Sequence, residues 1–163
     1  MTADIERDSR ATRRDVLKIA GALALGGGAA PAVVAPARAT PAEMQAAVAS
    51  IVGEARVNDG RVKLDIPPLV ENGNTVPCTV TVESPMTAAD HVKAIHVFTE
   101  KNPQPYVISV VLGPRAGRAS VSTRIRLRDS QTVLAVAEMS DGTFWSGRAG
   151  VIVTVSACLE DVL

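Results

Sequence analysis

Two cysteines are the side chains of this 163-residue sequence whose positions best suit covalent chemistry. A deprotonated thiol is a strong nucleophile and forms bonds to sulfur that can be broken again. Cys158 stands five residues before the last residue of the sequence, and such segments are exposed unless packing ties them down. An exposed thiol there would reach into a partner's active site and withdraw again. In the alternative interpretation, Leu159, Val162 and Leu163 fold back and cover the sulfur.

Cys78 occurs in a different setting, within a run of residues that alternates between apolar and polar. A period of two predicts a strand with one buried face, and Cys78 shares its face with Val76, Val80 and Val82. Burial raises the pKa of a thiol and blocks reagents from reaching it. Cys78 is therefore predicted to be a structural residue. A disulfide between Cys78 and Cys158 is the less favoured alternative, because a buried mid-strand residue would have to meet the terminal segment.

The remaining candidates for catalysis or metal binding are sparse. His91 and His96 are the only histidines, and a spacing of five places them on opposite faces of a strand, so they cannot share a metal ion. No serine stands in a Gly-x-Ser-x-Gly motif, and no local pair of carboxylates suits acid–base chemistry. The sequence therefore predicts a protein that is not an enzyme, with no catalytic residue, no metal site and no cofactor-binding residue.

The first 39 residues have the pattern of a twin-arginine export signal. Residues 12–18 read Thr-Arg-Arg-Asp-Val-Leu-Lys, and an uncharged stretch rich in Ala and Gly follows over residues 19–37. Residues 37–39 read Ala-Arg-Ala, which is the small-x-small pattern of a signal peptidase site. The prediction is a periplasmic protein whose mature chain begins at Thr40. An uncleaved basic anchor is the alternative.

The export route and the charge balance bear on possible partners. The twin-arginine route carries folded proteins, so we expect a partner without its own signal to travel with this chain. The 124 residues after the signal hold 11 basic and 13 acidic side chains. This balance creates no field that would attract a polyanion, so we expect no nucleic-acid binding. After signal cleavage we also expect no association with the membrane.

The mature chain is predicted to begin with a helix within residues 40–57. Thr40 can cap the helix, Pro41 suits its first position, and Glu43 stands where a capping box needs an acid. Gly53 is predicted to end the helix. An apolar stripe at helical spacing consists of Met44, Ala47, Val48 and Ile51.

From residue 61 onward, apolar residues recur at every second position, and turn residues separate the runs. This pattern predicts an all-β fold, an immunoglobulin-like antiparallel β-sandwich of about seven strands with a short N-terminal helix. The sandwich would span residues 58–157 and be followed by an arm, residues 158–163, that carries Cys158. A turn is expected at residues 71–74. The expected strands cover residues 61–66, 76–82, 92–99, 106–112, 119–128, 132–139 and 150–156.

One expected strand has an unusual outer face. Its exposed positions are predicted to be Ser120, Ser122, Arg124, Arg126 and Arg128. A solvated strand with charges that protect a sheet edge is one interpretation. A strip that faces a partner or attracts an anion is the other.

Five segments together carry a resemblance to a known family. They read LVENGNTVP over residues 69–77, ESPMT over 83–87, IHVFTEKNP over 95–103, VSTRIRL over 121–127 and VLAVAEMSDG over 133–142. These segments, in this order, resemble the SoxY family. The resemblance covers nearly all of the mature chain, and a twin-arginine signal is also usual in that family.

The resemblance implies an immunoglobulin-like subunit that forms a heterodimer with SoxZ and works in the periplasm during thiosulfate oxidation. In the family, the haem protein SoxAX joins thiosulfate oxidatively to a carrier cysteine. SoxB then hydrolyses off sulfate, and SoxCD oxidises the remaining sulfur. The carrier catalyses nothing. Cys158 lies where that cysteine falls, directly after the expected strand that ends in Val-Ile-Val-Thr-Val, so the resemblance implies covalent sulfur attachment at Cys158.

The end of the chain departs from the family pattern. Family members end in Gly-Gly-Cys-Gly-Gly, whereas residues 156–163 read Ser-Ala-Cys-Leu-Glu-Asp-Val-Leu. Glu160 and Asp161 should raise the pKa of the thiol and repel an anionic substrate. Two interpretations follow: a working carrier with an altered arm, or a SoxY-like paralogue that serves as a structural or binding module and has lost or changed the carrier role.

Overall fold

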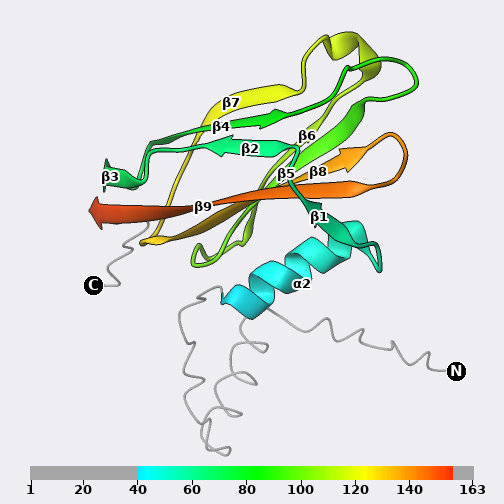
Figure 1. Cartoon of the computed structure of the whole chain (residues 1–163). Coiled ribbons are helices and arrows are strands. Elements are labelled where there is room, and N and C mark those ends of the chain that lie inside the picture. The colour runs from blue at the N-terminus through cyan, green and yellow to red at the C-terminus, as the bar shows by residue number, and fades with distance from the viewer. Residues whose placement is uncertain (1–39, 156–163) are drawn as a thin grey trace, which may run out of the picture. The chain divides into compact units, whose positions relative to one another are not determined.

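The computed structural model describes residues 40–155 (Figure 1). The predicted export signal and Cys158 therefore lie outside the described residues. The described part of the chain begins with helix α2 (Pro41–Val52) and continues mostly as strands. These are β1 (Val57–Asp59), β2 (Val62–Asp65), β3 (Leu69–Asn72), β4 (Val76–Val82), β5 (Val92–Thr99), β6 (Tyr106–Val111), β7 (Ser120–Ile125), β8 (Gln131–Met139) and β9 (Phe144–Val155), with a 3-10 turn η1 (Pro114–Ala116) before β7.

Helix α2 begins and ends at the residues that its sequence predicts. The Thr40 side chain accepts a hydrogen bond from the backbone of Glu43, and the Glu43 carboxylate accepts one from the backbone of Thr40, so the capping box is complete. The helix ends before Gly53, whose φ of 60° suits glycine. The helix ends where Gly53 was predicted to end it, and residue 57, the last of the predicted N-terminal segment 40–57, belongs to strand β1, which pairs with β9.

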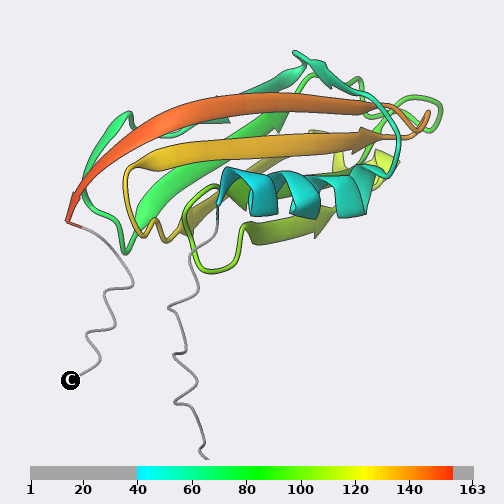
Figure 2. The ribbon, with the colours of Figure 1, turned by 90° about the horizontal axis from the view of Figure 1, so that it is seen from below.

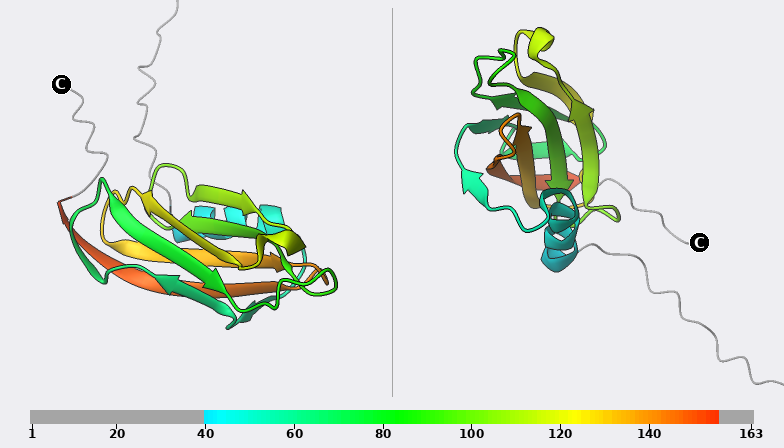
Figure 3. Two further views of the ribbon diagram at one scale, coloured as in Figure 1. Left: turned by 90° about the horizontal axis from the view of Figure 1, so that it is seen from above. Right: turned by 90° about the vertical axis from the view of Figure 1, so that its right-hand side faces the viewer.

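The strands form two sheets, as an immunoglobulin-like sandwich requires. The larger sheet has the order β1-β9-β8-β5-β6, with β3 also paired to β9, and the smaller has the order β2-β4-β7. Helix α2 lies across the outer face of the larger sheet (Figure 2). The two further views show the smaller sheet on the other side of the larger one (Figure 3). The prediction of an all-β sandwich with a short N-terminal helix is confirmed.

The main core lies between the two sheets. Val76, Cys78 and Val80 of β4 face Ile95 and Val97 of β5 and apolar residues of β8 and β9 across it. A second, smaller cluster packs α2 against the outer face of the larger sheet, and it consists of Met44, Phe98, Val136 and Phe144. The predicted inward face of β4 is therefore confirmed.

Some boundaries differ from the prediction. β1 and β3 were not expected; both are too short to show a period, and both run parallel to β9, whereas the other strand pairs are antiparallel. β3 includes two residues of the turn expected at 71–74. β9 begins at Phe144 rather than at residue 150, because Gly147 and Gly150 interrupt the apolar pattern. β7 ends at Ile125, so Arg126 and Arg128 follow the strand instead of belonging to it.

The described residues include one α-helix of 12 residues. No helix within residues 40–155 is long and apolar enough to cross a membrane.

Candidate functional site

The described end of β9 lies where three parts of the chain meet. The backbone carbonyl of Val155 accepts a hydrogen bond from Gly73 N at 2.9 Å, and the carbonyl of Gly73 accepts one from Leu127 N at 2.8 Å. Val153 N donates to the Ser130 hydroxyl at 2.9 Å. The end of β9 is therefore held beside the turn after β3 and the loop after β7. We call the end of β9, the turn after β3 and the loop after β7 together the rim. Cys158 comes three residues after Val155 in the sequence, so the segment that carries it follows directly from the rim.

The rim exposes apolar side chains. Leu69, Ile152 and Val155 are each about 60% exposed, and they account for three of the five large hydrophobic residues that are exposed within the described part of the chain. Leu69 lies opposite Ile152 in the β3–β9 register, so the two form one patch. Exposed apolar residues that gather in one place are typical of a contact surface.

Arg124 and Arg126 of the predicted strip line a recess between the two sheets. β6 is the last strand of the larger sheet, and β7 is the last strand of the smaller one. A recess of about 540 Å³ separates these two strands. Thr123 is exposed although its register partner Cys78 is buried, so the sandwich is open on this side. The recess is lined by Asn102, Pro103, Gln104, Tyr106, Val107, Ile108, Thr123, Arg124, Ile125 and Arg126.

A buried asparagine fixes the loop that carries Arg126. Asn102 Nδ2 donates to the carbonyl of Arg126 at 2.8 Å, and Asn102 Oδ1 accepts from Arg128 N at 3.0 Å. The same oxygen accepts from Gln131 Nε2 at 3.0 Å. Neither Asn102 nor Gln131 was singled out from the sequence. The position of Asn102 directly before Pro103 indicates a turn, but no local pattern reveals partners that lie 24 to 29 residues away.

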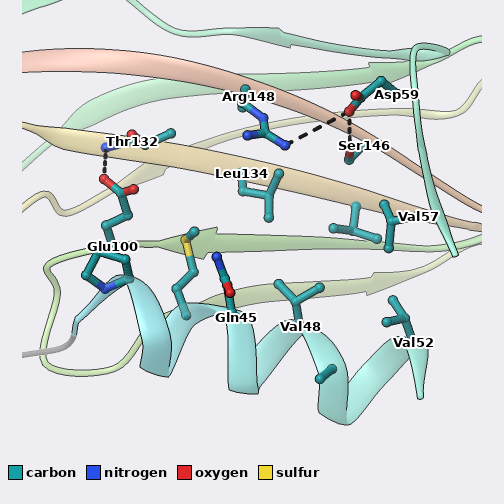
Figure 4. A pocket seen from close by; sticks show the side chains of 14 residues that line it. Gln45, Val48, Val52, Val57, Asp59, Glu100, Thr132, Leu134, Ser146 and Arg148 are labelled. Carbon is teal, nitrogen blue, oxygen red and sulfur yellow. Dashed lines mark hydrogen bonds and ion pairs between the residues drawn. The ribbon is translucent and has the colours of Figure 1, made fainter. Parts of the chain in front are cut away.

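A second recess, of about 470 Å³, lies between α2 and the larger sheet (Figure 4). Its two carboxylates each have a partner. The Glu100 carboxylate accepts from Thr132 N at 2.9 Å. Asp59 accepts from the Ser146 hydroxyl at 3.1 Å and lies 4.0 Å from a guanidinium nitrogen of Arg148. These contacts all join residues of the sheet and its loops, so the two carboxylates that line the recess already have partners.

Cys78 is sealed between the sheets. Its side chain is 1% exposed, and the residue is a free cysteine. Burial raises the pKa of the Cys78 thiol, so its reactive thiolate is disfavoured. The structure confirms Cys78 as a structural residue. Its pairing with Cys158 cannot be described, because Cys158 lies outside residues 40–155.

The two histidines do not come together. His91 Nδ1 lies 3.1 Å from the carbonyl of Thr87 and donates to it. His96 is buried, and its Nδ1 lies 2.8 Å from the hydroxyl of Tyr106. Burial lowers the pKa of His96, and the carboxylate of Glu138 partly opposes this shift. Within residues 40–155, no group of three or more His, Cys, Asp and Glu side chains is arranged to hold a metal ion.

A comparison with models of known protein families identifies the family of this chain. The family model of the sulfur oxidation protein SoxY matches residues 48–158. The chain belongs to the SoxY family. The match ends at Cys158, so it includes the residue that β9 leads to.

One solved structure agrees with the SoxY assignment, and another shares only the fold. The sulfur carrier protein SoxY from Chlorobium limicola f thiosulfatophilum is 26% identical with a TM-score of 0.60, over 70% of this chain and 98% of that chain. Superoxide reductase (neelaredoxin) from Ignicoccus hospitalis is 19% identical with a TM-score of 0.51, over 71% of this chain and 94% of that one, and this likeness shows the fold alone. A search of curated protein sequences found no match.

The SoxY-like segments of the sequence gather at the site. Residues 69–77 contain β3 and the turn with Gly73, to which the end of β9 is bonded. Residues 95–103 contain Asn102, and residues 121–127 contain Arg124 and Arg126. Three of the five segments therefore meet where the chain continues toward Cys158.

Proposed function

We propose that this chain is a non-catalytic sulfur carrier that holds the intermediates of thiosulfate oxidation covalently on Cys158. The observation that carries the proposal is the SoxY family match, which extends through the sandwich and ends at this residue. The named carrier from Chlorobium limicola, similar over 98% of its own length, supports the same role. The other cysteine is sealed in the core and cannot present its sulfur to an enzyme.

The proposed attachment is an oxidative coupling. The Cys158 thiolate and the terminal sulfur of thiosulfate form an S–S bond, and the two electrons released pass to the haem protein SoxAX. Hydrolysis by SoxB then adds water, releases sulfate and two protons, and leaves a persulfide anion on Cys158. SoxCD oxidises this remaining sulfur. The carrier supplies the thiol and its position, and each partner supplies the catalysis.

The proposed partner in a stable complex is SoxZ. The exposed apolar residues of the sandwich, Val111 at 81% and the Leu69–Ile152 patch, offer surfaces for SoxZ and for transient docking of SoxAX, SoxB and SoxCD. The proposed location is the periplasm, reached by the twin-arginine route. If the pair folds before export, deletion of the SoxZ gene should retain this chain in the cytoplasm. Undiminished export without SoxZ would contradict joint transport.

The test of function replaces each cysteine in the heterodimer. Cys158→Ser should abolish thiosulfate-dependent electron transfer by the reconstituted partners, because the covalent handle is gone. Cys78→Ser is the matched control; it should keep the activity of each folded molecule, while the buried hydroxyl lowers stability by about 1–3 kcal/mol. Electron transfer is measured at equal concentrations of folded protein. Equal loss in both variants would overturn the assignment, and full activity of Cys158→Ser would favour the paralogue that serves as a binding module.

A further inference from the structure

The side of the sandwich between β6 and β7 has two strand edges that pair with no other strand of residues 40–155. β6 and β7 each have a single neighbour within the described sheets, so the second edge of each strand is free. The recess of about 540 Å³ lies between them. A free strand edge binds an extended chain through backbone hydrogen bonds. This side of the sandwich therefore has the geometry to accept one more strand.

The two faces of β7 determine which side chains an added strand would need. Arg124 lies opposite the exposed Pro77 in the β4–β7 register, so it belongs to the outer face of the smaller sheet. Thr123 lies opposite the buried Cys78 and belongs to the inner face. Side chains alternate between the two faces of a sheet. A strand beside β7 would place every second side chain on the face of Arg124 and the others toward the recess.

The inner positions of such a strand would meet an apolar wall. Val107 and Ile108 of β6 line the recess and are only half-buried, although both pack against the main core. Ile125 of β7 lines the recess as well. Apolar side chains that enter the recess would cover these residues and extend the core between the sheets.

The outer positions would meet positive charge. Arg124 and Arg126 are exposed, and neither forms an ion pair with another residue of the described range 40–155. Asn102 holds the backbone carbonyl of Arg126 at 2.8 Å, which fixes the backbone and leaves the guanidinium available. No carboxylate is among the residues that line the recess. Because a guanidinium binds a carboxylate through two parallel hydrogen bonds, the matching side chains are Asp and Glu.

A second copy of this chain does not supply that match. Two β7 edges that pair about a twofold axis run antiparallel and bring Arg124 and Arg126 of both copies together. Like charges that lie opposite each other on neighbouring strands destabilise the pair. A long polyanion is disfavoured as well, because the 124 residues after the predicted signal hold 13 acidic and 11 basic side chains. The occupant that fits is a short acidic segment of another protein.

We propose that the recess between β6 and β7 binds an extended segment of a partner protein in which acidic and apolar residues alternate. The segment adds to the free edge of β7. Its carboxylates pair with Arg124 and Arg126, and its apolar side chains contact Val107 and Ile108. This contact goes beyond the proposed carrier function and involves no cysteine, so either of the two can fail while the other stands.

The test measures, by fluorescence anisotropy, how the full chain binds a labelled peptide of alternating Glu and Val that has six residues, the length of β7. Binding should be saturable and should weaken as the salt concentration rises, because the ion pairs are exposed. Arg124→Glu combined with Arg126→Glu should raise the Kd at least about tenfold, since attraction becomes repulsion at both positions. The same variant should bind a peptide of alternating Lys and Val, which also shows that it is folded.

Two controls separate strand addition at β7 from general attraction of charge. Arg56→Glu with Lys63→Glu changes the net charge equally at exposed positions that do not line the recess, and should change the Kd by less than about twofold. N-methylation of one alternating set of peptide nitrogens should abolish binding, and methylation of the other set should preserve it, because only one set faces β7.

Three results would overturn the proposal. The first is equal weakening in the Arg56/Lys63 control, which would show that net charge alone attracts the peptide. The second is binding that neither pattern of N-methylation changes, because an added strand must form backbone hydrogen bonds. The third is the absence of saturable binding below about 1 mM at low salt.

Discussion

The two sides of the sandwich are built in opposite ways. On one side β2 and β9 approach so closely that a Cβ added at Gly147 would lie 2.2 Å from the carbonyl oxygen of Val62. The guanidinium of Arg61 covers the ring of Trp145 on the same side, 4.9 Å from its centroid. On the other side β6 and β7 stand apart, a recess separates them, and the inward-facing Thr123 is exposed.

This difference separates stability from contact with partners. The closed side and the core between the sheets exclude water and hold Cys78 inert. The open side and the adjoining rim present arginines, free strand edges and apolar residues where the chain continues toward Cys158. Cys78 is therefore a packing residue, whereas Cys158 follows the described end of β9 in the sequence.

The largest expected effect comes from adding a side chain at Gly147, where β2 and β9 already lie in close contact. Gly147→Ala should destabilise the fold by about 3 kcal/mol, because its new methyl group overlaps the backbone of Val62 and the sheets must shift. Gly150→Ala is the control on the same strand; nothing lies within 4 Å of its added Cβ, so its effect should stay within about 0.5 kcal/mol. Urea denaturation measures both. Similar losses for the two variants would show that close approach is not what Gly147 provides.

A smaller effect should appear at alkaline pH through Cys78. Its pKa in the folded state is raised above its ordinary value of 9.0 by burial. The folded protein therefore keeps a proton that the unfolded chain releases, and stability is full below pH 9.0 and falls as the pH rises through the folded pKa. Chemical denaturation as a function of pH should show this fall in the original protein and a flatter profile in Cys78→Ala. Identical profiles would contradict the sealed environment of the thiol.

The smallest effect is expected at acidic pH through His96. Burial lowers its folded pKa below the ordinary value of 6.5, with the carboxylate of Glu138 partly opposing the shift. Below pH 6.5 the unfolded chain then binds a proton on His96 that the folded protein does not bind. The free energy of unfolding is therefore full above pH 6.5 and falls as the pH drops toward the folded pKa. His96→Gln should reduce this slope between pH 6.5 and 5. A slope that does not change would mean that other groups cause the acid sensitivity.

Much of this arrangement was predictable from local patterns. The capping box, Gly53 and the alternation around Cys78 specify their structures within a few residues, and the structure confirms them. β1 and β3 escaped prediction because three or four residues cannot show a period and their parallel pairing depends on β9 far along the chain. The roles of Asn102 and Gly147 depend on residues brought near by the fold. The arginine strip was visible in the sequence, but its position beside the end of β9 follows only from the hydrogen bonds of Gly73.

The most direct test of the carrier assignment is peptide mass spectrometry of the protein, in its proposed complex with SoxZ, after reaction with thiosulfate and SoxAX. The account predicts an added thiosulfate group on the peptide that contains Cys158 and an unmodified peptide around Cys78. An unmodified Cys158 under conditions in which SoxAX turns over, or an adduct on Cys78, would contradict it.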